Sequence, residues 1–248
     1  MSKVIYKIGD TQIKPGVKNP LIAIAYHICV VRPDLIVHIG DHHDYPSLSH
    51  YDKGKKSHRA KSYKADTEAG NKAFDEFFKI LDTMWPEHEN VCKKHFFKGN
   101  HEYRRERALE YGPDELLELM ESIEPDYSRF DHVHEFLVPH VIEGVTFCHY
   151  FQNEKSATAI GTARQLLLKQ HTSCVAGHSQ GFDYAEQLTG NGKVIQALIN
   201  GASYYHDEDY KKHNNHHFRG TVIMYNVKDG KFDFSRHSLE SLDTIYTR

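Results

Sequence analysis

The sequence predicts an α/β fold in which two mixed β-sheets form a sandwich flanked by helices. In the first half of the 248-residue chain, short apolar segments alternate with longer amphipathic ones, which is the pattern of strand–helix–strand units. From Glu135 onward most segments are strand-like, and only one good helix interrupts them. A chain of this length can bury one sizeable core, so we expect residues 1–248 to form a single domain.

In the first half, we expect strands and helices to follow one another in turn. The strands are expected at residues 4–8, 35–39 and 95–98. The helices are expected at residues 21–31, from Asp66 or Thr67 to Pro86, at 102–111 and at 113–123. In the longest helix apolar residues recur at intervals of three and four, which is the spacing of one helix face. Pro86 ends that pattern.

In the second half, we expect mainly strands joined by hairpins. The strands are expected at residues 136–138, 145–150, 174–176, 194–199 and 221–227. The one helix is expected at residues 157–170. Asn191-Gly192 and Asp229-Gly230 are dipeptides typical of tight turns, so they indicate hairpin connections.

The composition excludes several classes of protein. A net charge of -3 argues against a surface devoted to nucleic acid, although a local basic patch stays open. No run of about eighteen apolar residues occurs, so we expect no membrane span. A strand-like segment starts at Val4 and leaves no space for a secretion signal, which predicts a cytoplasmic protein. The four cysteines are far apart and predict no disulfide framework.

Polar clusters follow five of the strand-like segments. They are Gly9-Asp10-Thr11-Gln12, Gly40-Asp41-His42-His43-Asp44, Gly99-Asn100-His101-Glu102, Cys148-His149 and Gly177-His178-Ser179-Gln180. In open α/β sheets, ligands gather beyond the carboxyl ends of the strands, so these clusters should converge in space. The twenty histidines of the chain add to the indication of metal, because imidazole is the commonest transition-metal ligand.

In order and spacing, the five clusters resemble the calcineurin-like metallophosphoesterase superfamily. The family pattern reads D-x-H, G-D-x-x-D, G-N-H-[DE], a later His, and G-H-x-H, and the match extends from Asp10 to Gln180. The resemblance implies a four-layer α/β/β/α sandwich, two divalent cations and hydrolysis of phosphate esters. The compact chain also resembles phosphoesterases encoded by bacteriophages.

This sequence departs from the family pattern at two positions, where Gln12 and Gln180 replace histidines that serve one and the same metal. By resemblance, the first cation would be held by Asp10, Gln12, Asp41 and Gln180. The second would be held by Asp41, Asn100, His149 and His178, so that Asp41 bridges the two. Amide oxygens are hard, neutral donors and favour Mn²⁺, with Mg²⁺, Ni²⁺, Fe²⁺ or Zn²⁺ as alternatives. We expect the first metal to be bound more weakly and mainly by oxygen atoms, although the paired change is also compatible with loss of that metal.

The resemblance also implies roles in catalysis. Two cations can clamp a phosphate, lower the pKa of a bridging water and stabilise an in-line displacement. His101 resembles the proton donor to the leaving alkoxide, and Asp44 and Glu102 would orient it or its neighbours. Asn100, Arg104 and Arg105 are expected to bind the substrate, since a guanidinium group can bind two phosphate oxygens at once. The sequence leaves open which of the two arginines faces inward.

Several functions fit this pattern. A phosphodiesterase acting on a small or nucleotide-like substrate is favoured, because little chain is left for further recognition surfaces. A nuclease, a phosphomonoesterase or protein phosphatase, and a non-catalytic phosphate-binding relative are the alternatives.

Two charged segments bear on the choice of substrate. The basic residues Lys53, Lys55, Lys56, Arg59, Lys61 and Lys64 form either a solvated loop or a contact to a nucleic-acid backbone. The histidine-rich segment with His206, His213, His216 and His217 is either exposed or, at His206, part of the site.

Overall fold

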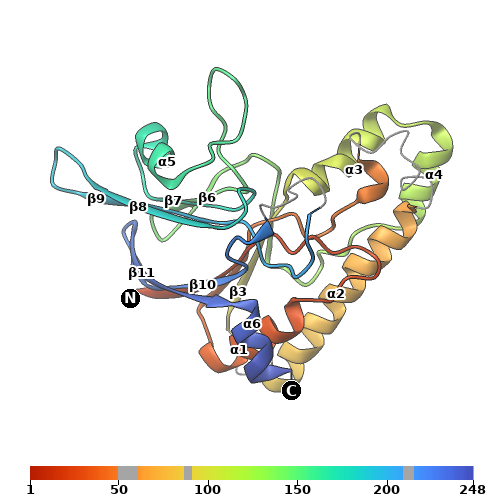
Figure 1. Cartoon of the computed structure of the whole chain (residues 1–248), viewed down its shortest axis with the longest axis horizontal. Coiled ribbons are helices and arrows are strands. Elements are labelled where there is room, and N and C mark those ends of the chain that lie inside the picture. Colours follow the sequence, from red (N-terminus) through yellow and green to blue (C-terminus); the bar gives the residue numbers. More distant parts are fainter. Residues whose placement is uncertain (50–60, 87–90, 209–214, 248) are drawn as a thin grey trace.

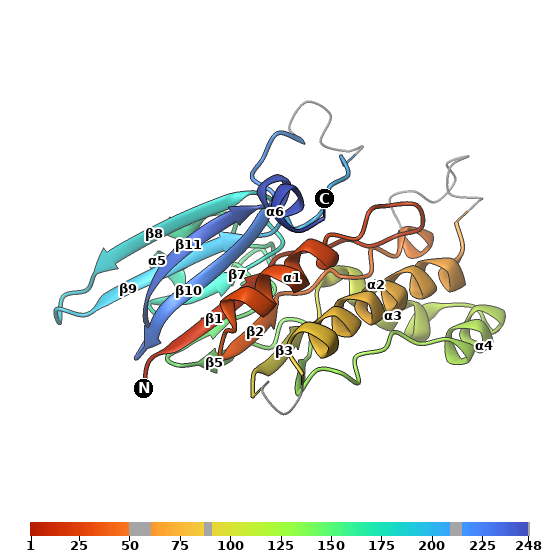
Figure 2. The ribbon, with the colours of Figure 1, turned by 90° about the horizontal axis from the view of Figure 1, so that it is seen from below.

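The computed structural model describes residues 1–49, 61–86, 91–208 and 215–247. Two β-sheets pack face to face; helices α1, α2 and α6 cover the outer face of one, and helix α5 covers the other (Figures 1 and 2). The layers therefore follow the order α/β/β/α. The predicted sandwich of two mixed sheets flanked by helices is confirmed.

The first sheet has the strand order β11-β10-β1-β2-β3-β4. Its strands are β1 (Lys3–Ile8), β2 (Leu35–His38), β3 (Lys93–Phe97), β4 (His132–His134), β10 (Gly220–Lys228) and β11 (Lys231–Ser238). Strands β1 to β4 run parallel, β10 pairs antiparallel with β1, and β11 pairs antiparallel with β10. The parallel part is the product of the alternating first half of the chain, as parallel strands need crossover connections.

The second sheet has the strand order β5-β6-β7-β9-β8. Its strands are β5 (His140–Ile142), β6 (Val145–Phe147), β7 (Cys174–Ala176), β8 (Phe182–Leu188) and β9 (Val194–Asn200). Strands β6, β7 and β9 are parallel, whereas β5 and β8 are antiparallel edges. Both sheets are therefore mixed.

The helices lie outside the sheets. They are α1 (Leu21–Val31), α2 (Tyr63–Met84), α3 (Asn100–Tyr111), α4 (Asp114–Ser122), α5 (Ala163–Gln170) and α6 (Leu239–Tyr246), with a short 3₁₀ turn η1 (Pro46–Leu48). Helix α2 begins three residues before the predicted Asp66, because the Ser62 hydroxyl accepts a hydrogen bond from the Ala65 N–H and caps the helix. No helix in the described part of the chain is long and apolar enough to cross a membrane.

The apolar core is divided by the sheets. Between the two sheets lies one cluster, represented by Val37, Phe97 and Phe147. A second cluster joins α1, α2 and α6 to the first sheet, and a third lies under α5. All four cysteines are buried and free, in agreement with the expectation of no disulfide framework.

Two predictions of secondary structure were wrong. Residues 136–138 lie in the turn region between β4 and β5 and do not form a strand. Helix α5 begins at Ala163, where the Thr162 side chain caps it, and the preceding residues are irregular with Ala157 at a positive φ of 53°. Strands β4, β5, β8 and β11 and helix α6 were not predicted. Strands β4 and β5 have only three residues each, and β8 and β11 carry many polar residues on their exposed faces, which weakens the apolar pattern.

Candidate metal centre

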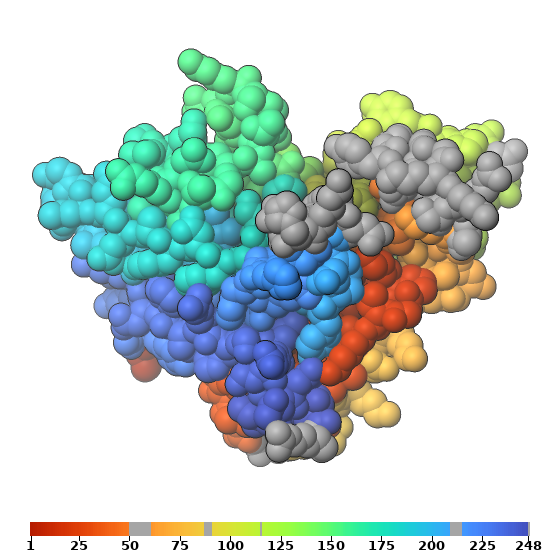
Figure 3. Space-filling view, viewed as in Figure 1, coloured from red at the N-terminus to blue at the C-terminus, as the bar shows by residue number. Residues whose placement is uncertain are grey.

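The five polar clusters meet at one end of the sandwich. Asp10, Asp41 and Asn100 follow the carboxyl ends of β1, β2 and β3, and His149 and His178 follow β6 and β7. Helices α3 and α4 and the loop after β6 project on either side of this end and leave a notch between them (Figure 3). The packing of the two sheets thus brings together residues from both halves of the chain.

Asp41 occupies the middle of the cluster. Its Oδ2 lies 3.3 Å from His149 Nε2 and 3.7 Å from His101 Nε2. Ligand atoms of Asp41, His149 and His178 all lie within 4.8 Å of one another. The Asn100 Oδ1 lies 3.0 Å from His149 Nε2. The four residues expected to hold the second cation are therefore adjacent.

Asp10 and Gln12 present buried oxygens on the same side. Asp10 Oδ1 accepts a hydrogen bond from the His178 backbone N–H at 3.2 Å. Within the described residues, Asp10 Oδ2 and Gln12 Oε1 have no hydrogen-bond partner although both are buried. Burial raises the pKa of Asp10 to about 7 against the opposing effect of His149. Oxygens in such a state fit a cation, because desolvated polar atoms without partners are costly. Gln180 is half-buried two residues beyond His178.

Charge in the cluster is dominated by Asp41. Burial alone would lower the pKa of His149, but the Asp41 carboxylate outweighs it and raises the pKa of His149 to about 9. The pKa of His178 is lowered to about 4 by burial and by the charge of His149. A cation between these groups would take over the role of the His149 proton, since a bound ion is the largest local charge in such a site.

Three of the expected ligands have an unusual backbone. Gln12, Asp41 and His178 adopt positive φ angles of 43°, 49° and 58°. For non-glycine residues this conformation costs roughly 1–2 kcal/mol each, so surrounding contacts must hold it. The same conformation also occurs away from the cluster, for example at Arg32 and Asn226, so here it reflects the sharp turns of the three loops.

Two motif glycines are required by close approach of the backbone. A Cβ atom at Gly99 would lie 2.1 Å from Asp41 Oδ1. Gly40 has a φ of 106°, and a Cβ there would lie 2.6 Å from the Phe97 carbonyl oxygen. The G-D and G-N pairs of the sequence thus let two loops touch directly beside Asp41.

Glu102 ties the same two loops together. Its Oε2 accepts hydrogen bonds from the backbone N–H groups of Gly99 and Asp41, both at 2.8 Å. Its Oε1 accepts from the N–H groups of His42 and His43 at 2.7 and 3.0 Å. Glu102 is buried, so these four bonds fix the position of Asp41.

His101 lies at the edge of the cluster and is oriented by Asp44. The His101 Nδ1 lies 2.9 Å from Asp44 Oδ1, and the Arg104 Nη2 lies 2.9 Å from His101 Nε2. Lys14 binds the other oxygen of Asp44 at 2.8 Å. Burial disfavours the charged ring, but the Asp41 and Asp44 carboxylates outweigh it and raise the pKa of His101.

Of the two arginines, Arg105 does not face this cluster. Its guanidinium donates to the Tyr63 hydroxyl at 2.9 Å and to the Met120 carbonyl at 3.3 Å, and it pairs with Glu124. Consecutive residues of a helix point about 100° apart, so α3 turns Arg104 toward Asp44 and Arg105 toward α4.

Sequence reasoning missed two features of the site. Lys7 is fully buried beneath Asp10 and donates to the Asn200 carbonyl, and burial lowers the pKa of Lys7 to about 7. A lysine within an apolar strand was the available signal. The rings of Phe136 and Tyr150 lie 6.4 and 5.7 Å from that of His149, and they form an aromatic wall that no sequence pattern indicated.

Parts of the two charged segments lie outside the described residues. These are Lys53, Lys55, Lys56, Arg59 and His213. Of the remainder, Lys64 forms an exposed pair with Glu68 on α2. His206 Nε2 lies 3.2 Å from Glu208 Oε1, and its ring lies 4.7 Å from that of Tyr204.

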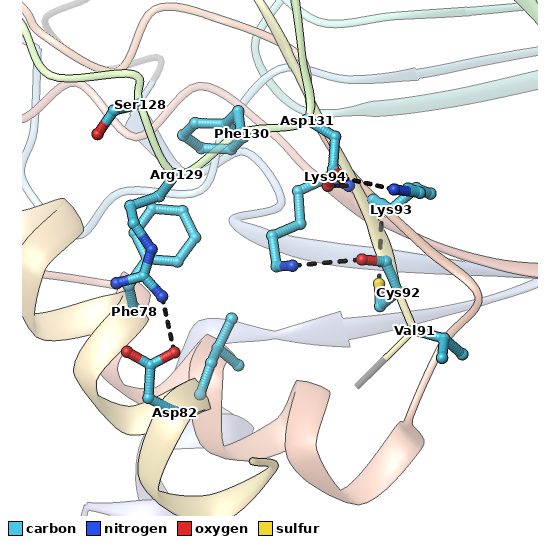
Figure 4. Close-up of a pocket in the computed structure, with 11 residues that line it drawn as sticks. Phe78, Asp82, Val91, Cys92, Lys93, Lys94, Ser128, Arg129, Phe130 and Asp131 are labelled. Atoms are coloured by element: carbon cyan, nitrogen blue, oxygen red, sulfur yellow. Dashed lines mark hydrogen bonds and ion pairs between the residues drawn. The ribbon is translucent and has the colours of Figure 1, made fainter. Parts of the chain in front are cut away.

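A surface cavity of about 740 Å³ lies at the other end of β3 (Figure 4). Its basic side chains are engaged: Lys93 binds Asp131, Arg129 binds Asp82, and Lys94 donates to the Cys92 carbonyl. Two of these three cations are thus paired with carboxylates, and the third is held by a backbone carbonyl.

The fold and the cluster define the chain as a two-sheet α/β/β/α protein with a candidate metal centre at one end of its sheets. No family model matches the sequence. The chain is 31% identical to the Gene 54 protein of Mycobacterium phage L5 over 209 residues, which cover 80% of this chain and 78% of that protein. It therefore belongs to the family of this phage protein, and the expected relation to bacteriophage proteins is confirmed.

Two further proteins are similar over different spans. The Gene 54 protein of Mycobacterium phage D29 is 42% identical over 74 residues, which cover 30% of this chain and 29% of that protein. Among solved structures, the Zn²⁺ complex of Vps29 from Entamoeba histolytica is 13% identical with a TM-score of 0.37, covering 95% of this chain and 99% of that one.

Proposed function

We propose that this chain is a metal-dependent phosphoesterase of the calcineurin-like type and that phosphodiesters are its preferred substrates. The observation that carries the proposal is the convergence of Asp10, Asp41, Asn100, His149 and His178 from five loops. Two buried oxygens of this cluster, on Asp10 and Gln12, have no hydrogen-bond partner among the described residues. Such a set of carboxylate, amide and imidazole donors fits divalent cations.

Two cations are proposed, with Mn²⁺ favoured. Asp10, Gln12, Asp41 and Gln180 would hold the first, and Asp41, Asn100, His149 and His178 the second. When bound, the cations would supply positive charge for the phosphate oxygens and lower the pKa of a water molecule. Asp41 belongs to both sets of ligands, and its backbone N–H is held by Glu102, so the two sets would keep a fixed distance from each other.

His101 is proposed as the proton donor to the leaving group. Asp44 Oδ1 lies 2.9 Å from its Nδ1, so the ring turns Nε2 toward Asp41, 3.7 Å from Asp41 Oδ2, and the raised pKa of His101 favours the protonated form. In the free protein Arg104 donates to this Nε2. A substrate phosphate would attract the Arg104 guanidinium and release Nε2 to carry a proton.

Charge at the rim favours a diester over a monoester. Among the described residues beside His101, Lys14 and Arg104 both contact Asp44, which offsets part of their charge. A diester carries one negative charge at neutral pH and needs less compensation than a doubly charged monoester. Nucleic acid remains a proposed substrate through residues 53–64.

The experiment compares a chromogenic phosphodiester with the matching monoester, using metal-stripped protein with Mn²⁺, Mg²⁺, Ni²⁺ or Zn²⁺ added back. Two histidines give a matched pair of variants: His178 and His171 both have positive φ, at 58° and 54°, so alanine is placed in a similar backbone conformation at each. His178→Ala should lose activity by a factor of a hundred or more, on the order of one lost metal ligand or catalytic donor. His171→Ala should retain it.

Metal-restored hydrolysis that prefers the diester would support the proposal. Folded protein without activity toward either ester, with every cation, would contradict it and favour a non-catalytic phosphate-binding protein. Faster hydrolysis of the monoester would contradict the preferred substrate class alone.

A further inference from the structure

A second group of histidines lies at the edge where the two sheets meet. It consists of His95 on β3, His134 on β4 and His140 on β5. Strand β4 is the last strand of the first sheet and β5 is the last strand of the second. The three rings therefore come from both sheets, and none of them belongs to the candidate metal centre.

The geometry of the three rings is close to that of a metal site. His95 Nδ1 lies 3.0 Å from His134 Nε2, and the rings of His134 and His140 have centroids 4.3 Å apart. One nitrogen from each ring lies within 4.8 Å of the other two. Tetrahedral zinc with Zn–N distances of about 2.0–2.1 Å places its nitrogens about 3.3 Å apart, so small side-chain rotations suffice.

The positions of two of these rings are restrained by their surroundings. His95 is buried, and its Nδ1 faces the Nε2 of His134. His134 also stacks on Phe97 with centroids 4.3 Å apart, which limits the motion of its ring.

We propose that His95, His134 and His140 bind one Zn²⁺ that joins the edges of the two sheets. Three imidazoles are a ligand set that suits zinc, and His140 is exposed, so a water molecule can complete the coordination. The ring of His132 lies 4.6 Å from that of His95 and offers a fourth imidazole nearby.

Zinc at this edge would act on the candidate metal centre through the loop of residues 135–139. The loop connects His134 to His140, so one ion would hold both of its ends. Within it, Glu135 pairs with Lys98 at 2.8 Å, directly before the Gly99-Asn100 motif. Phe136 stacks on Tyr103 with centroids 4.8 Å apart and faces His149. The ion would therefore position part of the aromatic wall.

The test measures Zn²⁺ binding to the intact, metal-stripped protein by equilibrium dialysis and metal analysis. We compare the parent with His140→Gln, His134→Gln and the control His171→Asn. His171 is an exposed residue at the carboxyl end of α5. Each of the first two variants should lose one bound equivalent of zinc, and the control should lose none. Equal zinc content in all four proteins would overturn the proposal.

A second experiment measures whether zinc orders the loop between His134 and His140. Amide hydrogen exchange at residues 135–138 should slow when Zn²⁺ is added to the parent, and this protection should be absent in His140→Gln. Protection that is unchanged by the substitution would overturn the proposed link between the sheet edges. Neither readout depends on hydrolysis, so a failure of the phosphoesterase proposal would be seen separately.

Discussion

Replacement of Glu102 by glutamine should strongly destabilise the protein. The carboxylate accepts four backbone hydrogen bonds, two at each oxygen, from Gly99, Asp41, His42 and His43 at 2.7–3.0 Å. Glutamine has only one oxygen, so two N–H groups would face its NH₂ group and lose their acceptor. Hydrogen bonds to a charged group contribute about 1.5–3 kcal/mol each, which predicts a loss of about 3–6 kcal/mol.

This loss is a large part of the stability expected for a domain, which is about 5–15 kcal/mol. In a chain of this size it corresponds to a fall in Tm of roughly 6–24 °C. Urea unfolding at pH 7 and thermal melting both measure it in the metal-stripped protein. Glu118→Gln, at an exposed position on α4, is the control and should change the stability by less than about 0.5 kcal/mol. A loss below about 1 kcal/mol for Glu102→Gln would refute the assigned role of these four bonds.

Three further predictions follow from other contacts. Gly99→Ala should lower the stability by about 1–3 kcal/mol and weaken cation binding, because the new Cβ would lie 2.1 Å from Asp41 Oδ1. Thermal melting and metal-binding assays measure the two effects. The control Gly190→Ala should show neither effect, since its Cβ would have no atom within 4 Å. Asp44→Asn removes a charge that raises the pKa of His101, so the alkaline limb of the pH–rate profile should move to lower pH by about one unit. The control Asp75→Asn, at an exposed position, should leave this limb in place. Burial lowers the pKa of His27 to about 4, so the unfolded chain takes up a proton before the folded one as the pH falls from 6.5 to 4. Folding stability should drop across this range, and His27→Gln should reduce the drop by roughly 1–2 kcal/mol in urea titrations; an unchanged drop would show that His27 is not its source.

Much of the framework was determined by local patterns in the sequence. The predicted strands at residues 4–8, 35–39 and 95–98 each overlap a strand of the first sheet, and the helix at 21–31 has the predicted bounds. Apolar runs and helical periodicity predict such elements well because both depend on near neighbours in the chain. The positions of the five polar clusters after strands were predicted for the same reason, and the strand order then brought them together.

Other features depended on how an element was rotated against its neighbours. Arg104 and Arg105 are adjacent and chemically equal, and only the packing of α3 against α4 and η1 turned the first toward Asp44 and the second toward Glu124. Residues 136–138 are apolar and were expected to be a strand, but the edges of two different sheets flank them and leave them as a turn.

The amino-acid pattern alone indicated which residues are able to bind metal and where the chain turns to present them. Which of these residues meet depended on the fold, because contacts between distant segments depend on sheet order and side-chain direction. The joining of Asp10 to His178 required the two sheets to pack at the carboxyl ends of their strands. The grouping of His95, His134 and His140 required the edges of the same sheets to adjoin, which no spacing in the sequence could indicate.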